Sequence, residues 1–389
     1  MARPAALRLL AFTGALAYGA LALGSAADRL AAQHPALGGW VPAPFANESL
    51  RADGRAQLAA GNTAAALRSA RAAVSAAPLD PESTALLGAA RAASRDRAGA
   101  DRAFRVAGQL GWRVPYTQTY WLEQALAAGD YATAALRLDA LLRRDPGLIT
   151  QPALLDPFER NPAGQRALVA RMALRPAWLD RYAGEAARLP AAALRQRATV
   201  LEQLAAANTP LGCEGIGPAI TRLAALGEIA PALSLWQRHC PQRRSGALGD
   251  GAFADLQIDQ APSPFAWALT SHADVALALA ASGMAGQRLM IDSSASVTRR
   301  IAAQLTPAAP GLYRLSWLAG PSGAGLRVAA SCAAEPPAWQ AGTWDGRARR
   351  WAADLALPAD CPTHWITFGI APGAGGTWLN QVWLEPLGR

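Results

Sequence analysis

A period of 34 residues, sustained over three consecutive units, constrains this chain more than any other feature of its sequence. When the units begin at residues 47, 81 and 115, their register holds without a gap, and position 20 is Ala in all three, at Ala66, Ala100 and Ala134. A repeat of this length is a supersecondary unit that buries its apolar face by stacking on its neighbours. The sequence therefore predicts a solenoid rather than one global fold.

Other positions of the repeat carry the residues that a helix–turn–helix unit needs. Small or aromatic side chains stand at positions 8, 15, 17 and 24, at Gly54, Gly88, Gly61, Gly129, Tyr131 and Phe104. This pattern resembles the tetratricopeptide repeat, in which small residues let the two helices approach closely. The resemblance implies units at 47–80, 81–114 and 115–148. Leu122, Arg95 and Trp112 depart from it at positions 8, 15 and 32.

Helical periodicity continues beyond the third unit. We expect degenerate hairpins over 149–211 and a last hairpin at 213–241, so that a helical solenoid covers 47–243. The resemblance implies a concave surface that docks a protein partner. The side chains that we expect to line it belong to the first helices of the units, and they are Arg55, Arg91, Gln118 and Trp121.

The N-terminal segment 1–29 is expected to meet a membrane. Residues 9–27 carry no charge and follow Arg3 and Arg8, and as a helix they would reach about 28 Å, close to the hydrocarbon thickness of a bilayer. We predict a single-pass inner-membrane anchor with a cytoplasmic N-terminus and a periplasmic bulk. The alternative is a signal peptide cleaved after the small residues 25–27, which would release the chain into the periplasm or medium.

The four cysteines fall into two pairs, one in the helical part and one in the last third. If residues 213–240 form an antiparallel helical hairpin, Cys213 and Cys240 lie at the same end, and a disulfide between them is expected. The second expected pair is Cys332–Cys361. Two buried free thiols in each pair are the alternative, because only an oxidising compartment favours the bonds. No CxxC is present, and we predict no metal site and no cofactor.

Residues 246–389 have a different texture, with short apolar runs separated by Gly, Pro, Asp and Ser. Such spacing predicts an antiparallel β-sandwich. Gly251-x-Phe253, Pro310-Gly311-x-Tyr313 and Trp378-x-x-x-Val382 resemble the jelly-roll domains grouped as carbohydrate-binding modules or galactose-binding-like domains. The fold class is thus a multi-domain α-then-β chain: an N-terminal transmembrane helix, a helical solenoid and a jelly roll.

Sugar binding needs open aromatic faces beside polar partners. The best candidates are Trp339 and Trp344, with Asp345 and Arg347 beside them, in a loop between two apolar runs. The competing interpretation of these tryptophans is that they close one end of the sandwich.

The chain shows no catalytic motif. It contains no Lys, which excludes a Walker A lysine and a Schiff-base lysine, and its four His are far apart in sequence. The net charge of +9 comes from Arg scattered singly along helical segments, a distribution that does not favour nucleic-acid binding.

The predicted function is a non-catalytic, membrane-anchored periplasmic scaffold that binds a protein partner. The combined domains resemble bacterial envelope proteins associated with surface-polysaccharide assembly, which implies a partner from that process. The alternative is a glycan-binding protein in which the sandwich binds polysaccharide and the solenoid is a spacer.

Overall fold

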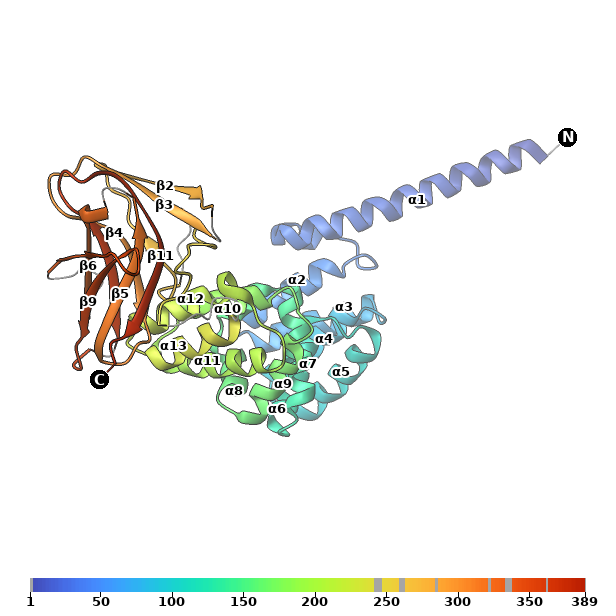
Figure 1. The fold of residues 1–389 in the computed structure, drawn as a ribbon. Coiled ribbons are helices and arrows are strands. Elements are labelled where there is room, and N and C mark those ends of the chain that lie inside the picture. Colours follow the sequence, from blue (N-terminus) through green and yellow to red (C-terminus); the bar gives the residue numbers. More distant parts are fainter. Residues whose placement is uncertain are drawn as a thin grey trace. The chain divides into compact units, whose positions relative to one another are not determined.

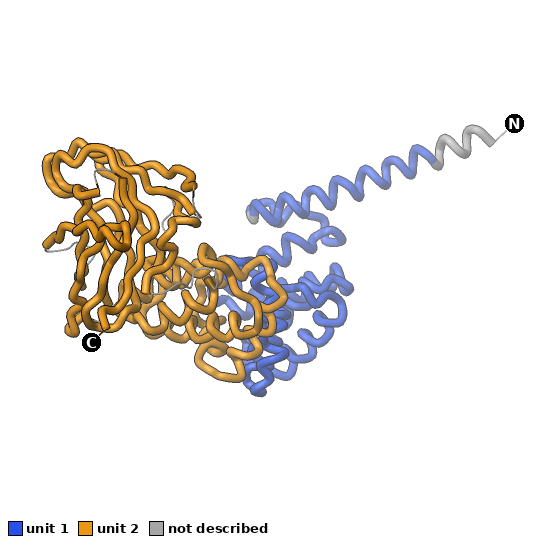
Figure 2. Tube along the Cα trace, in the orientation of Figure 1, with its two compact units in different colours: residues 1–148 blue, residues 149–389 orange. Residues whose placement is uncertain are grey.

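The computed structural model describes residues 3–240, 247–258, 263–283, 286–320, 323–332, 338–361 and 363–388. The chain forms two compact units, residues 1–148 and 149–389 (Figure 2). The described elements of unit 1 are all helices, and unit 2 continues with helices before the chain changes to strands (Figure 1).

Unit 1 begins with α1 (Arg3–Gln33) and the short 3-10 helix η1 (Pro35–Trp40). Asp28 links α1 to α2 (Glu48–Ala59), because its carboxylate accepts hydrogen bonds from the backbone N–H groups of Asn47, Glu48 and Ser49 at 2.8–3.1 Å. The first turn of a helix has no internal partners for these donors. A side chain of α1 therefore caps the helix that opens the repeats.

The expected membrane span, residues 9–27, lies inside α1. Among the residues that the structure describes, however, no helix combines the length and the apolar character that a bilayer crossing requires.

Three helical hairpins follow α1 in unit 1. They pair α2 with α3 (Thr63–Ala76), α4 (Pro81–Ala93) with α5 (Arg97–Leu110), and α6 (Pro115–Ala127) with α7 (Tyr131–Arg144). The second helices begin at residues 63, 97 and 131 and end at 76, 110 and 144, so both ends recur every 34 residues. The sequence period is thus the spacing of the helices.

The turn inside each hairpin uses a left-handed residue. Gly61, Arg95 and Gly129 have φ angles of 76°, 63° and 71°. Glycine adopts this conformation without steric cost, whereas Arg95 carries a Cβ into it. In the second and third hairpins the next residue, Asp96 or Asp130, caps the following helix by accepting a backbone N–H.

Small residues let helices approach closely, both within a hairpin and between neighbouring hairpins. Ala66, Ala100 and Ala134 are fully buried. A Cβ on Gly54 would lie 2.8 Å from Leu86, and one on Gly88 would lie 3.0 Å from the ring of Phe104. A side chain at either glycine would push apart the helices that the repeat stacks together.

Unit 2 begins with α-helices whose lengths vary from 6 to 16 residues, and with a short 3-10 helix. They are α8 (Pro152–Glu159), α9 (Pro162–Met172), α10 (Leu179–Gly184), η3 (Glu185–Arg188), α11 (Ala191–Ala206), α12 (Gly212–Ala225) and α13 (Ile229–His239). The 3-10 helix η2 (Pro146–Thr150) precedes them. The predicted boundary between solenoid and sandwich, at 243–246, lies outside the described residues.

The last part of unit 2 contains two antiparallel sheets. The first has the strand order β1 (Ala268–Leu269), β4 (Arg299–Thr306), β10 (His364–Ile370), β6 (Leu326–Ser331) and β7 (Gln340–Ala341). The second has the order β2 (Val275–Ala281), β3 (Gln287–Ser293), β11 (Gly375–Pro386), β5 (Gly311–Ala319), β9 (Arg350–Leu357) and β8 (Thr343–Asp345). The chain therefore has the predicted order of helices followed by an antiparallel β-sandwich.

Buried side chains from both sheets form one hydrophobic core. Trp317 of β5 meets Phe368 of β10 edge to face at 5.4 Å between ring centroids, and Trp267 lies 5.8 Å from the same Phe368 ring. All three rings are at most 2% exposed. Aromatic contacts of this kind hold the two sheets face to face.

Candidate functional site

A pocket of about 260 Å³ lies among α5, α6 and α7 of unit 1, and we call it the repeat pocket. Its lining comes from two consecutive hairpins, and consists of Arg105, Gly108, Gln109, Trp112, Thr117, Gln118, Trp121 and Arg137. A Cβ on Gly108 would lie 3.6 Å from Nε1 of Trp121, so the absent side chain leaves this part of the pocket open.

Gln118 is the most unusual residue of the repeat pocket. It is 1% exposed, and neither Oε1 nor Nε2 of its carboxamide has a hydrogen-bond partner among the described residues. Thr117, also 1% exposed, has an unpartnered Oγ1, and Nε of Arg137 is buried with no partner in the described part of the chain. Buried polar groups are nearly always hydrogen-bonded. Three such groups in one pocket therefore point to a ligand.

The remaining lining supplies aromatic surface and positive charge. Trp121 is half-buried and meets Tyr120 edge to face at 5.3 Å, whereas Trp112 is 53% exposed at the rim, with Arg113 stacked 5.0 Å from its ring. Arg105 forms an ion pair with Asp101. The other lining guanidinium, that of Arg137, has no ion pair among the described residues, and the lining contains no carboxylate, which favours a ligand with negative charge.

The structure brings together two of the four predicted partner-binding residues, Gln118 and Trp121. Arg55 lies 3.8 Å from the carboxylate of Glu82. Arg91 donates to the carbonyl of Gly99 at 3.1 Å and lies 3.9 Å from the carboxylate of Asp96, so it ties α4 to α5. Neither arginine lines the repeat pocket.

Thr117 and Arg137 were not predicted from the sequence as lining residues, and Trp112 was regarded only as a departure from the repeat. One signal was available, because Trp112 stands at the position where the first and third units have Pro78 and Pro146. Nothing comparable marks Thr117 or Arg137, since their role depends on which helices meet.

The four glycan candidates are divided between the two sheets. Trp339 packs on β10, where a Cβ on Gly369 would lie 2.9 Å from its ring. Trp344 belongs to β8 of the other sheet, is 53% exposed and meets Trp351 edge to face at 5.8 Å. Asp345 accepts the backbone N–H groups of Ala348 and Arg347, which lower its pKa. Its carboxylate is therefore used by its own turn.

A second pocket, of about 270 Å³, lies on β2, β3 and β11, and we call it the sheet pocket. Its lining is Ala276, Ala278, Met290, Ile291, Asp292, Gly376, Thr377 and Trp378. The guanidinium of Arg288 lies 4.5 Å from the Trp378 ring. The sheet pocket thus offers one aromatic ring, small neighbours and one carboxylate.

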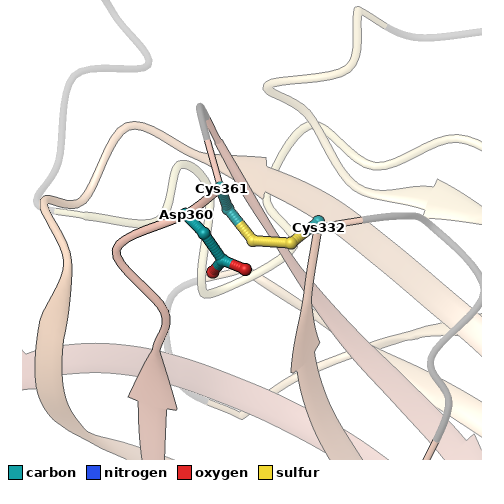
Figure 3. Close-up of side chains that lie close together, drawn as sticks. All are labelled: Cys332, Asp360 and Cys361. Carbon is teal, nitrogen blue, oxygen red and sulfur yellow. A yellow bond between two sulfur atoms is a disulfide. The ribbon is translucent and has the colours of Figure 1, made fainter.

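Both predicted cysteine pairs are disulfide-bonded in the structure. The Cα atoms of Cys213 and Cys240 are 5.2 Å apart, and those of Cys332 and Cys361 are 5.3 Å apart. Asp360 lies beside the second bridge, and its carboxylate and the two sulfurs are within 4.8 Å of one another (Figure 3). Because the sulfurs are bonded to each other, this cluster lacks the thiolates that a zinc site uses.

The helices of unit 2 bury a second polar cluster, formed by Glu159, Tyr182 and Arg197. Oε1 of Glu159 accepts hydrogen bonds from the Tyr182 hydroxyl at 2.6 Å and from Nε of Arg197 at 2.9 Å. The guanidinium also stacks 4.2 Å from the Tyr182 ring. Burial, reinforced by the Glu159 carboxylate, raises the pKa of Tyr182 well above its usual value, so its hydroxyl remains protonated.

Neither a protein-family model nor a curated protein sequence matches this chain.

Proposed function

We propose that this chain is a non-catalytic scaffold of the tetratricopeptide-repeat type, which binds a protein partner through its helical hairpins. The observation that carries the proposal is the repeat pocket, where three buried polar groups of the third hairpin lack partners among the described residues. A repeat array presents such surfaces to a peptide or protein, and stacking of the units keeps them rigid.

We further propose that α1 anchors the scaffold in the bacterial envelope. Apolar side chains of α1 are exposed, among them Phe12 at 63%, Leu16 at 59% and Leu23 at 73%. An inner-membrane anchor would hold the bulk of the chain in the periplasm, an oxidising compartment in which the two disulfides would persist. The partner would belong to envelope or exopolysaccharide assembly, as the resemblance implies.

Site-specific photo-crosslinking tests the scaffold. A photoreactive amino acid would replace Gln109 at the pocket, Arg55 on α2 or Leu312 on the sandwich, each in the full-length chain expressed in its own cells. We expect a discrete crosslinked protein from residue 109 or 55 and none from residue 312. Crosslinking from residue 312 alone would move the binding activity to the sandwich.

The anchor is tested on the same cells. We expect the protein to keep its uncleaved N-terminus. We also expect that alkaline carbonate does not extract it from membranes. A mature N-terminus near residue 28 in a soluble fraction would replace the anchor by a cleaved signal peptide.

The alternative function, glycan binding by the sandwich, is favoured by one observation, the sheet pocket with its Trp378 ring. A pyranose can stack its C–H face on such a ring while the Asp292 carboxylate accepts a hydrogen bond from a sugar hydroxyl. A glycan array with the wild type, Trp378→Ala and Trp344→Ala decides this alternative. Binding that only Trp378→Ala abolishes, with folding intact, places the glycan in the sheet pocket, and no binding to any polysaccharide removes the alternative.

A further inference from the structure

We infer that the repeat pocket binds an extended, acidic peptide segment, with Gln118 pairing to the backbone of one residue and Arg137 pairing to an acidic side chain. This inference rests on the proposed function, because it names the chemistry that the scaffold would recognise in a partner.

Gln118 identifies the backbone part of the ligand. Its buried carboxamide offers one acceptor, Oε1, beside one donor group, Nε2, and both lack partners among the residues described. The N–H and C=O of a single residue in an extended chain point to the same side, which is how paired strands exchange two hydrogen bonds. One extended residue can therefore satisfy both atoms of the carboxamide at once. A lone carboxylate cannot, because it has no donor for Oε1.

Arg137 identifies the acidic part of the ligand. Its buried Nε lines the same pocket, and the described residues supply it with no acceptor. A carboxylate can bind Nε and a terminal nitrogen of a guanidinium together, a geometry that favours Asp or Glu over a neutral side chain. The lining contains no carboxylate that would repel a negatively charged side chain of the ligand. The hydroxyl of Thr117 can donate to the same group.

The tryptophans and the size of the repeat pocket limit what can enter. Trp121 forms a wall and Trp112 an exposed rim, and rigid aromatic side chains often anchor peptide contacts. A volume of about 260 Å³ is below the range of about 300–1,000 Å³ that is usual for small-molecule sites. The pocket therefore accommodates one or two side chains of a longer segment that continues over the surface.

The competing explanation is that water alone hydrates Gln118, in which case the pocket has only a structural role. Two variants separate these explanations. Gln118→Met keeps the shape of the side chain and removes both hydrogen-bonding atoms. Gly108→Leu leaves Gln118 unchanged and fills the space beside Trp121, and its matched control is Gly108→Ala, whose Cβ makes only ordinary contacts of 3.6–3.8 Å.

The experiment uses full-length protein in detergent and a random heptapeptide library displayed on phage, with Gly108→Leu protein for counter-selection. We expect enriched peptides that contain Asp or Glu. For a synthetic peptide of the enriched sequence, titration followed by tryptophan fluorescence should show at least tenfold weaker binding to Gln118→Met and to Gly108→Leu, and wild-type affinity for Gly108→Ala.

Changes in the peptide then test each contact. N-methylation of one backbone amide should weaken binding at least tenfold in wild type but little in Gln118→Met, because that variant has already lost the acceptor. Replacing the acidic residue by its amide should weaken binding at least fivefold in wild type and have little effect in Arg137→Gln.

Several results would overturn the inference. They are enrichment of peptides without acidic residues, equal binding to wild type and Gln118→Met, no enrichment over the Gly108→Leu counter-selection, or Gln118-dependent binding of N-acetylglucosamine oligomers in place of peptides. The proposed function fails separately: peptides that bind in vitro without any crosslinked partner in cells would remove the scaffold, whereas a crosslinked partner captured equally by Gln118→Met would remove only this pocket.

Discussion

The repeat pocket and the Glu159–Tyr182–Arg197 cluster both bury polar side chains among helices, but among the described residues only the cluster gives them partners. In the cluster, one carboxylate oxygen accepts two hydrogen bonds and the guanidinium stacks on a ring, with Glu159 and Arg197 at most 3% exposed. In the pocket, the Gln118 carboxamide is equally buried, and the described residues leave both of its polar atoms unpaired.

This difference separates a polar group that specifies the fold from one that awaits a ligand. A buried polar group without a partner costs about 1–3 kcal/mol, whereas a satisfied one is close to neutral. Loss of either partner in the cluster should therefore lower the stability of the folded protein. Loss of the polar atoms in the pocket should raise the stability of the free protein and weaken its binding of a ligand.

The largest expected effect is on the cluster. Glu159→Leu leaves the Arg197 guanidinium buried without its carboxylate, and should lower the free energy of unfolding by about 3–5 kcal/mol. Chemical denaturation measures the loss. The double variant Glu159→Leu/Arg197→Met should recover most of it, because no buried charge remains. A loss below about 1 kcal/mol in the single variant would show that the cluster does not contribute as the geometry indicates.

The second prediction concerns His239, a buried polar group that is satisfied only when neutral. Its Nδ1 accepts the backbone N–H of Leu211 at 3.0 Å, so Nε2 carries the proton and donates to the Leu201 carbonyl at 3.0 Å. Burial, and secondarily Arg238, lowers the pKa of His239 below its usual value. Below a pH of about 6.5, the unfolded chain takes up a proton that the folded chain does not, and stability falls.

Denaturation midpoints at several pH values from about 7.5 to 5.5 measure this effect. The free energy of unfolding should fall with decreasing pH by at most about 1.4 kcal/mol per pH unit, which is the value for the uptake of one proton. His239→Gln, which retains a donor and an acceptor without titrating, should show a flatter dependence over the same window. An unchanged slope would assign the pH dependence to other groups.

The third prediction concerns the Gln118 carboxamide in the repeat pocket. Gln118→Met should raise the free energy of unfolding by about 1–2 kcal/mol, since it removes two buried atoms that have no partner in the described part of the chain. Thermal melting of wild type and variant without peptide measures the change. A clear destabilisation would place Gln118 with Glu159, as a residue that the fold needs.

The smallest effect serves as the matched control. Arg95 is exposed and occupies the left-handed turn position that Gly61 and Gly129 fill in the other hairpins. Arg95→Gly should stabilise the chain by about 0.5 kcal/mol, because relief of strain exceeds the added entropy of the unfolded state. It should not alter peptide binding. If it weakened binding as Gln118→Met does, stability rather than pocket chemistry would explain both results.

Much of the architecture could be predicted from the sequence, because its signals are local. The spacing of Gly54, Ala66 and Ala100 indicated helices that stack every 34 residues, and the short apolar runs after residue 246 indicated strands. The repeat pocket was only half predictable. Gln118 and Trp121 were named as first-helix side chains, whereas Arg55 and Arg91, chosen by the same reasoning, form ion pairs or backbone contacts with neighbouring residues.

The sequence by itself determined the order of helices and strands, the hairpin period and the turn positions, because each depends on residues within about one repeat. Only the tertiary structure decided which polar atoms have partners. Gln118 and Glu159 are both polar residues of helical segments, and nothing local distinguishes them. Tyr182 and Arg197 reach Glu159 from 23 and 38 residues away, while the helices around Gln118 bring it no such partner. Hydrogen bonding acts over about 3 Å, and the distances between side chains of different helices are fixed only when the chain has folded.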